Sequence, residues 1–315
     1  MRLPGFVPLA SCPARGENAA TMSLRLYDAH NHLHDDRFGG RRTELLRDCA
    51  AAGVAAMVVN GSCEEDWPEV LALAKANGRA GTPLPAEPTS ATSGAHGVTR
   101  PTRIIPSFGY HPWYIHERTG DWLKNLVRFL DEVPSAVGEI GLDRWKPGLN
   151  YDGQEEIFVA QLRLAAQRNL PVSIHCLQAW GRMLDILKAE PRPACGFLLH
   201  SYGGPKEMVK PLADLGAYFS LPGYYAHERK ARQRETFRVV PRDRLLIETD
   251  APDQSLPEER NRFPLTDSST DKPLNHPANL RAVLEFAAEL IDEPVEVMAG
   301  RVEQNFERLF GGPST

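Results

Sequence analysis

Two histidines that are one residue apart offer the first recognisable chemistry in this chain. His30 and His32 lie in the run Asp28-Ala29-His30-Asn31-His32, directly after a short apolar segment at residues 24–27. The apolar segment predicts a β-strand, and side chains two positions apart along a strand point the same way. Because imidazole is the commonest metal ligand in proteins, this pair can bind one ion from a single stretch of backbone.

Four more residues of ligand type directly follow apolar runs that predict strands: Glu139, His175, His200 and Asp250. A lone His-x-His pair also occurs by chance, so the later residues are what make the pair informative. The carboxyl ends of parallel strands meet at one edge of a sheet, where α/β active sites are built. Six ligand residues at these positions therefore predict one metal centre rather than a set of unrelated core histidines.

The number of ligands predicts how many ions the centre takes. Six ligands exceed what one tetrahedral ion needs, and they suit two divalent ions that share a carboxylate. The predicted assignment divides the ligands between the ions: His30, His32 and Asp250 for one, His175 and His200 for the other, and Glu139 as the bridge. Two divalent cations outweigh two carboxylates even with a bridging hydroxide, so the centre attracts an anion such as a phosphate ester.

The predicted chemistry is hydrolysis of that ester by an activated water. Two ions stabilise both the attacking and the leaving oxygen of an in-line displacement. Asp250 is the predicted acceptor of the water's proton, and Glu139 takes part as the bridging ligand. Imidazole favours zinc, whereas carboxylate and phosphate also suit magnesium or manganese, so the ligand types leave Zn, Mg and Mn open.

Several polar residues close to the predicted ligands receive weaker assignments. His111 follows another predicted strand and is expected to contact the substrate phosphate, with a structural turn as the alternative. Asp28 and Glu248 are expected to orient the ligands, with a strand cap and a salt bridge as their respective alternatives. Asp143 is interpreted as ordering the loop after Glu139.

The elements that must position these residues alternate between strand and helix about eight times along the chain. Apolar strands separated by helix-length connections predict a parallel sheet with right-handed crossovers. At this length, eight such units favour a single (β/α)8 TIM barrel over an open doubly wound sheet. No glycine-rich dinucleotide fingerprint follows any predicted strand, which also disfavours the open sheet.

The predicted domain covers residues 23–312 and is interrupted by one insertion. Residues 1–22 are rich in proline and alanine and predict a disordered leader, and Met22 is an alternative start. Residues 78–103 are rich in Pro, Thr, Ser and Gly and predict a surface insertion. A decorative loop and a substrate lid both remain open for that insertion.

Composition limits the compartment and the partners. The net charge of −5 disfavours a broad basic surface for duplex binding, although a metal centre supplies local positive charge. Five widely spaced cysteines without a C-x-x-C motif predict reduced thiols and a cytoplasmic location. No stretch approaches the ~20 apolar residues of a membrane span, so no membrane partner is expected. Composition leaves the oligomeric state open and is compatible with a monomer.

The motifs, taken in order, resemble the TatD-type metal-dependent deoxyribonucleases of the amidohydrolase superfamily. The resemblance spans about residues 24 to 311, and its motifs are Asp28-Ala29-His30-Asn31-His32-Leu33, Gly109-Tyr110-His111-Pro112, Gly138-Glu139-Ile140-Gly141-Leu142-Asp143, Pro171-Val172-Ser173-Ile174-His175, Leu199-His200-Ser201-Tyr202, Glu248-Thr249-Asp250-Ala251-Pro252 and Asn275-His276-Pro277. The resemblance implies a barrel, two divalent metals held by the same six residues, and hydrolysis of phosphodiesters, typically of DNA from an end.

Four departures from the family pattern lie near the expected substrate rim. Leu177 stands where the family usually has an arginine, Arg144 replaces a frequent aromatic residue, the segment after His200 reads Ser-Tyr-Gly-Gly, and the insertion at residues 81–103 is extra. The substrate is therefore less determined than the metals. An amide, ester or lactone hydrolase, or a deaminase of a small molecule, is the alternative enzyme, and a binding protein that keeps the barrel is the third possibility.

Overall fold

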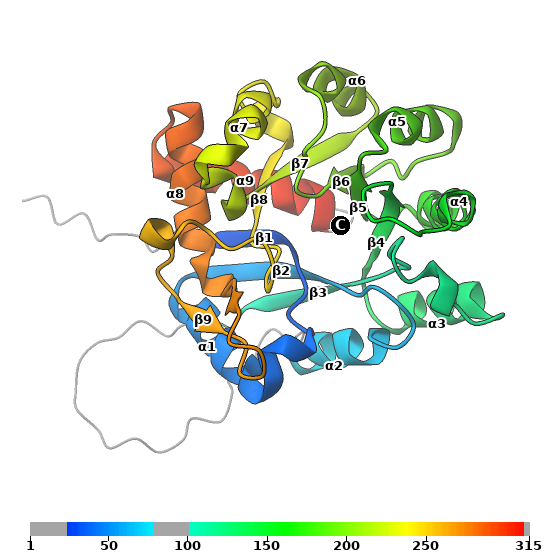
Figure 1. The fold of residues 1–315 in the computed structure, drawn as a ribbon, viewed down its shortest axis with the longest axis horizontal. Helices are drawn as coiled ribbons and strands as arrows, with labels where there is room; N and C mark the ends of the chain where they lie inside the picture. Colours follow the sequence, from blue (N-terminus) through cyan, green and yellow to red (C-terminus); the bar gives the residue numbers. More distant parts are fainter. Residues whose placement is uncertain (1–23, 78–100, 312–315) are drawn as a thin grey trace, which may run out of the picture.

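A single parallel sheet forms the centre of the molecule. The computed structural model describes residues 24–77 and 101–311, so the predicted leader and most of the predicted insertion lie outside the described residues. The sheet contains eight strands in the order β1 to β8, which curl into a barrel (Figure 1). The strands are β1 Leu26–Asn31, β2 Val54–Asn60, β3 Arg103–Phe108, β4 Ala136–Asp143, β5 Val172–Leu177, β6 Phe197–Leu199, β7 Ala217–Pro222 and β8 Leu245–Glu248.

Helices surround this barrel because each parallel strand requires a crossover connection. The helices are α1 Arg42–Ala51, α2 Trp67–Asn77, α3 Trp122–Glu132, α4 Tyr151–Arg168, α5 Trp180–Ala189, α6 Val209–Asp214, α7 Ala231–Phe237, α8 Leu280–Ile291 and α9 Val295–Phe310. Seven of them, α1 to α7, each lie between consecutive strands (Figure 1). The predicted (β/α)8 TIM barrel is therefore confirmed.

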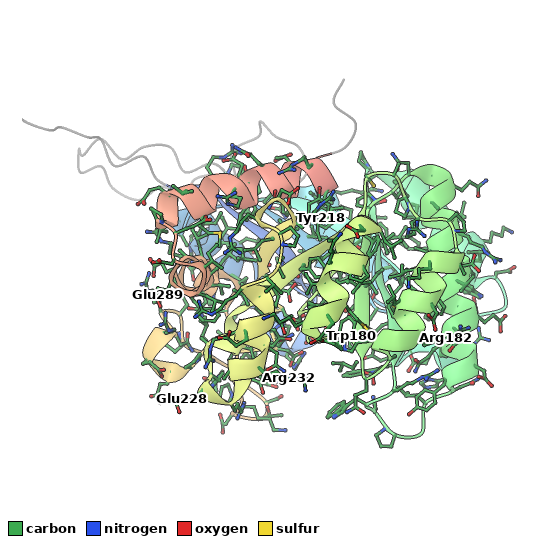
Figure 2. All side chains as sticks on the ribbon, turned by 90° about the horizontal axis from the view of Figure 1, so that it is seen from above. Trp180, Arg182, Tyr218, Glu228, Arg232 and Glu289 are labelled. Carbon is green, nitrogen blue, oxygen red and sulfur yellow. The ribbon has the colours of Figure 1, made fainter. Side chains whose placement is uncertain are left out.

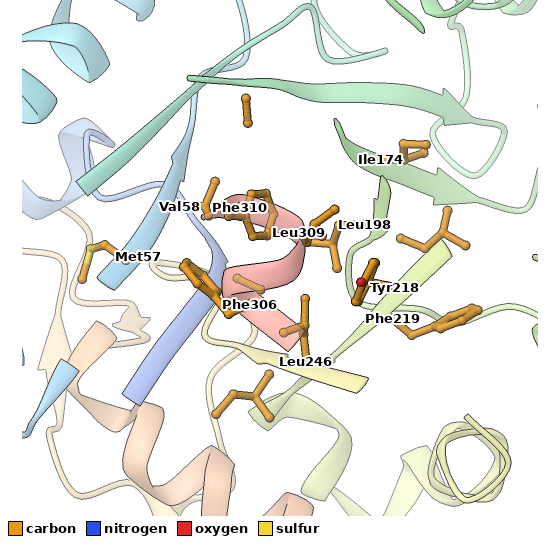
Figure 3. Packing of buried hydrophobic residues seen from close by; sticks show 14 of the residues in the cluster. Met57, Val58, Ile174, Leu198, Tyr218, Phe219, Leu246, Phe306, Leu309 and Phe310 are labelled. Carbon is orange, nitrogen blue, oxygen red and sulfur yellow. The ribbon is translucent and has the colours of Figure 1, made fainter. Parts of the chain in front are cut away.

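The last helix, α9, covers the N-terminal end of the barrel. Figure 2 shows it across the same end as Tyr218, which lies near the start of β7. Phe306, Leu309 and Phe310 are buried and face strand side chains such as Val58 (Figure 3). Because apolar side chains fill this end, the opening of the barrel lies at the other end, where the strands finish.

Two strands extend further than the apolar pattern predicts. β1 runs to Asn31, so His30 lies inside the strand, and β4 runs to Asp143, well past the predicted end at residue 138. The prediction ended the two strands directly before Asp28 and Glu139. In the fold these residues stay in the strand because they face the barrel opening, where polar side chains gather.

The segment after β8 contains a feature that the sequence did not predict. The short strands β9 Leu265–Thr266 and β10 Pro273–Leu274 pair antiparallel there. Within residues 24–77 and 101–311, no helix is long and apolar enough to cross a membrane. The cysteines in these ranges are unpaired thiols: Cys49, Cys63, Cys176 and Cys195.

Candidate metal centre

Glu139 lies at the centre of the histidines that the sequence predicts as ligands. Its Oε2 atom is 3.2 Å from His32 Nε2 and 3.4 Å from His30 Nε2. Its Oε1 atom is 2.7 Å from His200 Nε2 and 3.0 Å from His175 Nδ1. One oxygen of the carboxylate therefore faces the pair from β1, and the other faces the histidines from β5 and β6.

Asp250 completes the side of the centre that contains the β1 histidines. Its Oδ1 atom is 3.5 Å from His30 Nε2 and 3.7 Å from His32 Nε2. Two backbone hydrogen bonds bring these segments together: Asp250 N donates to His30 O at 3.0 Å, and His32 N donates to Ala251 O at 2.7 Å. The same two bonds connect the ends of β1 and β8, where the barrel closes.

Asp28 strengthens this junction instead of touching a ligand ring. Its carboxylate accepts hydrogen bonds from Thr249 N at 2.9 Å and Thr249 Oγ1 at 2.6 Å. It also accepts a longer one from His30 N at 3.3 Å. Asp28 thus contacts the backbone beside the predicted ligands His30 and Asp250, and its expected role in orienting an imidazole ring remains a prediction.

Three of the imidazole rings are oriented by hydrogen bonds on the side away from Glu139. His32 Nδ1 donates to Asn60 O at 2.8 Å, which leaves the lone pair on Nε2 facing the centre. His30 Nδ1 lies 2.8 Å from Ser173 Oγ, so the Nε2 atom of that ring also faces inward. Fixed tautomers and ring orientations of this kind are typical of metal-ligating histidines.

His175 obtains its orientation from Asp143, a contact that the sequence analysis missed. His175 Nε2 donates to Asp143 Oδ2 at 3.0 Å, which leaves the lone pair of Nδ1 toward Glu139. The alternation of side chains along β4 could have indicated this contact, because Glu139 and Asp143 lie on the same face of that strand. Gly141 lies between them at φ 150°, and a Cβ atom there would be 1.9 Å from His175 O.

Glu248 lies beside His200 but bonds elsewhere. Its carboxylate accepts hydrogen bonds from the hydroxyls of Ser201 and Ser220. The closest distance to the ring, between Glu248 Oε1 and His200 Nδ1, is 3.8 Å, and the Nδ1 atom is buried without a hydrogen-bond partner. Glu248 can therefore act on this ring only through its negative charge and not through a hydrogen bond. Its predicted role in orienting the ring remains a prediction.

His111 also reaches the centre, with its Nε2 atom 3.4 Å from Glu139 Oε1. Trp113 N donates to His111 Nδ1 at 3.2 Å, so the ring proton is on Nε2. Burial lowers the pKa of His111 to about 4, which leaves the ring neutral. A neutral ring with its N–H toward the centre is a hydrogen-bond donor for an anion rather than a metal ligand through that atom.

The electrostatics of the cluster fit divalent cations. Burial disfavours the charged form of Glu139, but the surrounding imidazoles, His200 foremost, hold its pKa well below the usual range. Its Oε1 atom is nevertheless buried and accepts no hydrogen bond. Burial, followed by the charge of His200, lowers the pKa of His30 to about 3, so that this ring is neutral, as a ligand must be.

Among the described residues, three overlapping groups of nitrogen and oxygen ligands could each hold an ion: His30, His32 and Glu139; His30, His200 and Asp250; and His111, Glu139 and His175. Every predicted ligand occurs in at least one group, and Glu139 occurs in two of them. Against the effect of their burial, Glu139 raises the pKa of His32, His175 and His200, so these rings hold protons that bound cations would replace. Imidazoles around an ionised carboxylate form a donor set that suits zinc, manganese or related ions.

The centre opens into a cavity of about 850 Å³ at the C-terminal end of the barrel. One part of its wall is apolar and aromatic, with Trp113, Tyr114, Trp145 and Leu177. Besides the predicted ligands, the lining contains these carboxylates: Asp35, Asp36, Glu65, Asp66, Glu69, Glu117 and Asp253. Arg37 is the one arginine or lysine among the lining residues, and it forms ion pairs with Asp35 and Asp253.

Comparison with known proteins identifies the family. A family model described as TatD related DNase matches residues 27–311. The chain belongs to this family. A TatD-family relative of Escherichia fergusonii, named "3'-5' ssDNA/RNA exonuclease TatD", is 35% identical over 292 residues, which are 91% of this chain and 99% of the relative. The sequence-based assignment to the TatD-type metal-dependent hydrolases is therefore confirmed.

Other TatD-family relatives have less specific names. The "Uncharacterized metal-dependent hydrolase YabD" of Bacillus subtilis is 28% identical over 90% of this chain and 98% of its own length. The solved structure of the TatD homologue YjjV from Escherichia coli covers 93% of this chain and 100% of its own, with a TM-score of 0.76 and 26% identity. A TatD-family hydrolase from Entamoeba histolytica, at 17% identity and a TM-score of 0.75, shares the fold.

Proposed function

We propose that this TatD-family enzyme hydrolyses phosphodiester bonds of DNA, or of a related phosphodiester, with two divalent ions held in the barrel opening. The proposed ligands are those expected from the sequence: His30, His32 and Asp250 for one ion, His175 and His200 for the other, and Glu139 between them. Membership of the TatD-related DNase family supports the reaction class.

The observation that carries this proposal is that the two oxygens of the Glu139 carboxylate face two different groups of histidines. Oε2 faces two histidines of one segment, and Oε1 faces one histidine in β5 and one directly after β6, all within 3.4 Å. A carboxylate that presents each oxygen to a separate group of imidazoles has the arrangement of a bridging ligand. A single ion would leave one of these groups without a purpose.

The chain's own residues supply binding and proton transfer. When bound, the divalent ions would lower the pKa of a water molecule and neutralise charge on the phosphate. Asp250 Oδ2 accepts a hydrogen bond from Gln254 Nε2 at 2.5 Å, which fixes the carboxylate at the cavity wall. We assign Asp250 as the acceptor of the water's proton, because its carboxylate is within reach of the same space as the ligands.

His111 is assigned to the substrate. Its Nδ1 atom accepts the Trp113 backbone N–H, so its Nε2–H is directed toward the centre beside Glu139. A non-bridging phosphate oxygen bound there would accept this hydrogen bond. Such a donor stabilises charge that develops during displacement, and it costs no reorganisation because Trp113 holds the ring in place.

Metal stoichiometry and substrate scope together test this function. Protein prepared metal-free is titrated with Zn, Mn or Mg and then incubated with bis-nitrophenyl phosphate, single-stranded DNA and a panel of amides, esters and lactones. We expect two equivalents of metal, phosphodiester cleavage, and loss of both an equivalent and the cleavage in Glu139→Gln. Fewer than two equivalents in the parent protein would refute the two-ion centre.

The same panel decides between the proposal and the alternative enzyme. Turnover of an amide, ester or lactone without phosphodiester cleavage would favour a small-molecule hydrolase, and deamination of a nucleobase would favour a deaminase. The carboxylates around the cavity are the reason to include these substrates, because they repel additional phosphates. Metal binding without any turnover would favour a binding protein.

Several further expectations from the sequence belong to this proposal. We infer one catalytic domain over residues 23–312, with a separate leader at residues 1–22 and an insertion at about residues 78–103. A cytoplasmic location is supported by the unpaired cysteines among the described residues. A monomer remains the simplest expectation for the oligomeric state, and sedimentation of the purified chain would measure it.

A further inference from the structure

The opening of the barrel is electrostatically divided. The carboxylates that line the cavity are concentrated in the segments after β1 and β2, where they include Asp35, Asp36, Glu65, Asp66 and Glu69. Helix α2, which follows β2, lies on the opposite side of the barrel from α7 (Figure 1). The carboxylates after β1 and β2 repel the phosphates of a polynucleotide that leaves the centre. A polynucleotide is therefore expected to leave on the α7 side.

The segment that follows β7 and continues into the first turn of α7 carries the opposite charge. Residues 227–234 read His-Glu-Arg-Lys-Ala-Arg-Gln-Arg, with four arginines and lysines against one glutamate. Among the described residues, Arg229, Lys230 and Arg232 form no ion pair with a carboxylate. Arg229 and Arg232 are exposed and Lys230 is partly exposed. Glu228 marks this segment at the end of the molecule opposite α9 (Figure 2).

Two of these cations are held in place by an aromatic ring. The Arg229 guanidinium lies 5.1 Å from the centroid of the Tyr224 ring and donates a hydrogen bond to Tyr224 Oη at 2.8 Å. Lys230 Nζ lies 4.6 Å from the same centroid. Cations positioned over a ring lose less conformational freedom when they bind phosphate than cations on free side chains do.

The cationic segment is connected to the metal centre by a continuous set of contacts. Arg234 donates to the carbonyls of Tyr225 at 2.9 Å and His227 at 2.6 Å, which fixes the shape of the segment. Tyr225 Oη donates to Ser201 O at 2.7 Å, and Ser201 lines the cavity. Gln254 Nε2 then lies 2.5 Å from both Ser201 Oγ and Asp250 Oδ2.

We propose that a single strand of DNA or RNA leaves the metal centre over this segment, with its backbone phosphates bound by Arg229, Lys230 and Arg232. The proposal rests on the phosphodiesterase function proposed above, and it adds the path that the nucleic acid follows over the surface. Cations on one short segment match the phosphates of one flexible strand better than the two backbones of a rigid duplex. The acidic side of the opening then faces the end of the strand that carries no further phosphate.

The test compares two double variants on two substrates. Arg229→Ala/Lys230→Ala removes cations from the segment. Lys188→Ala/Arg308→Ala removes the same number of exposed cations, one from the last turn of α5 and one from α9. Each protein, loaded with the metal that supports the parent activity, is assayed on bis-nitrophenyl phosphate and on a long single-stranded oligonucleotide over a range of salt concentrations.

We expect the segment variant to lose about tenfold in kcat/KM on the oligonucleotide. The slope of log kcat/KM against log salt concentration should become shallower by about 1.4, because two phosphate contacts on a single strand are lost. Cleavage of bis-nitrophenyl phosphate should stay within about twofold, as should both activities of the control variant. Equal behaviour of the two variants, or an equal loss on both substrates, would overturn the proposal.

Two further arms separate the possible failures. Neutralising the acidic side with Asp36→Asn/Glu65→Gln should change oligonucleotide cleavage by less than about twofold, and a tenfold gain would place the strand on that side instead. Poly-glutamate and a phosphorothioate strand are compared as inhibitors of oligonucleotide cleavage. Equal inhibition by the two would refute the proposal that the cationic segment binds nucleic acid. A parent protein that cleaves only the small diester overturns the strand path alone, whereas one that cleaves neither substrate overturns the phosphodiesterase function as well.

Discussion

Replacing Asp143 by asparagine tests how the metal centre obtains its geometry. The Oδ1 atom of Asp143 accepts the backbone N–H groups of Trp145 at 2.7 Å and Lys146 at 2.9 Å. The Oδ2 atom accepts Trp113 Nε1–H at 2.6 Å and His175 Nε2–H at 3.0 Å. The carboxylate therefore satisfies four donors, and each oxygen serves two of them.

An asparagine side chain has the same shape but only one acceptor atom. Its oxygen is expected to stay on the two backbone N–H groups, which places the amide NH2 where Oδ2 now meets Trp113 and His175. The N–H groups of Trp113 and His175 would then face the amide NH2, which is itself a donor. His175 relieves this conflict if its proton moves from Nε2 to Nδ1, because Nε2 can then accept a hydrogen bond from the amide. Nδ1 is the atom that lies 3.0 Å from Glu139, so the ring loses the lone pair that would bind metal.

The size of the effect follows from measurements on comparable partners of metal-binding histidines. Loss of such a partner lowers metal affinity by about 10- to 100-fold, which is about 1.4 to 2.7 kcal/mol of binding free energy. We expect this loss for one of the two proposed ions, because the β1 histidines do not contact Asp143. The other ion should bind with nearly unchanged affinity.

Competition with a chromophoric chelator measures both affinities in Asp143→Asn and the parent protein. Asp185→Asn is the matched control, because Asp185 is exposed on α5 and the change in charge is the same. Thermal unfolding in chelator verifies that the metal-free variant is folded. Unchanged affinity for both ions in Asp143→Asn would refute the argument that this carboxylate selects the tautomer of His175.

Three further predictions address the rest of the molecule. His111→Ala should lower kcat/KM on bis-nitrophenyl phosphate about 100-fold while both metal equivalents remain, and loss of an equivalent would instead make this residue a ligand. Phe306→Ala should lower the free energy of unfolding by about 3 to 5 kcal/mol in urea titrations, since Phe306 is fully buried in the end of the barrel, whereas the exposed Gln304→Ala should change it little. Metal at 100 times its dissociation constant should stabilise the fold by about 2.7 kcal/mol per site and raise Tm by about 5 to 10 °C for each site, and an unchanged Tm would contradict metal binding to the folded chain.

Local sequence patterns were sufficient to predict the barrel and to nominate the ligands. The strands are apolar runs that are buried on both faces, and the helices between them have the length that parallel crossovers require. His30, Glu139 and His200 could be recognised because each follows an apolar run at the position where a barrel builds its site. These predictions succeed because the alternation of side chains along a strand and the handedness of a crossover do not depend on distant residues.

Contacts between strands could not be predicted in the same way. Nothing near His175 in the sequence indicates that its partner is Asp143, 32 residues earlier, because the two meet only where β4 and β5 lie side by side. The same applies to Ser173 Oγ beside His30 and to the carbonyl of Asn60 beside His32. These partners decide which nitrogen of each ring faces Glu139.

The sequence by itself determined that His30 and His32 lie together at the end of one strand and that the other candidate ligands lie at later strand ends, since these statements need only local periodicity. Tertiary structure decided how the Glu139 carboxylate is divided, with Oε2 toward the β1 pair and Oε1 toward His175 and His200. It also decided that the acidic and basic segments of the opening lie on opposite sides of the barrel. The physical reason is that hydrogen bonds and charges act over a few ångströms in space, whereas closure of the barrel brings together segments far apart in the chain.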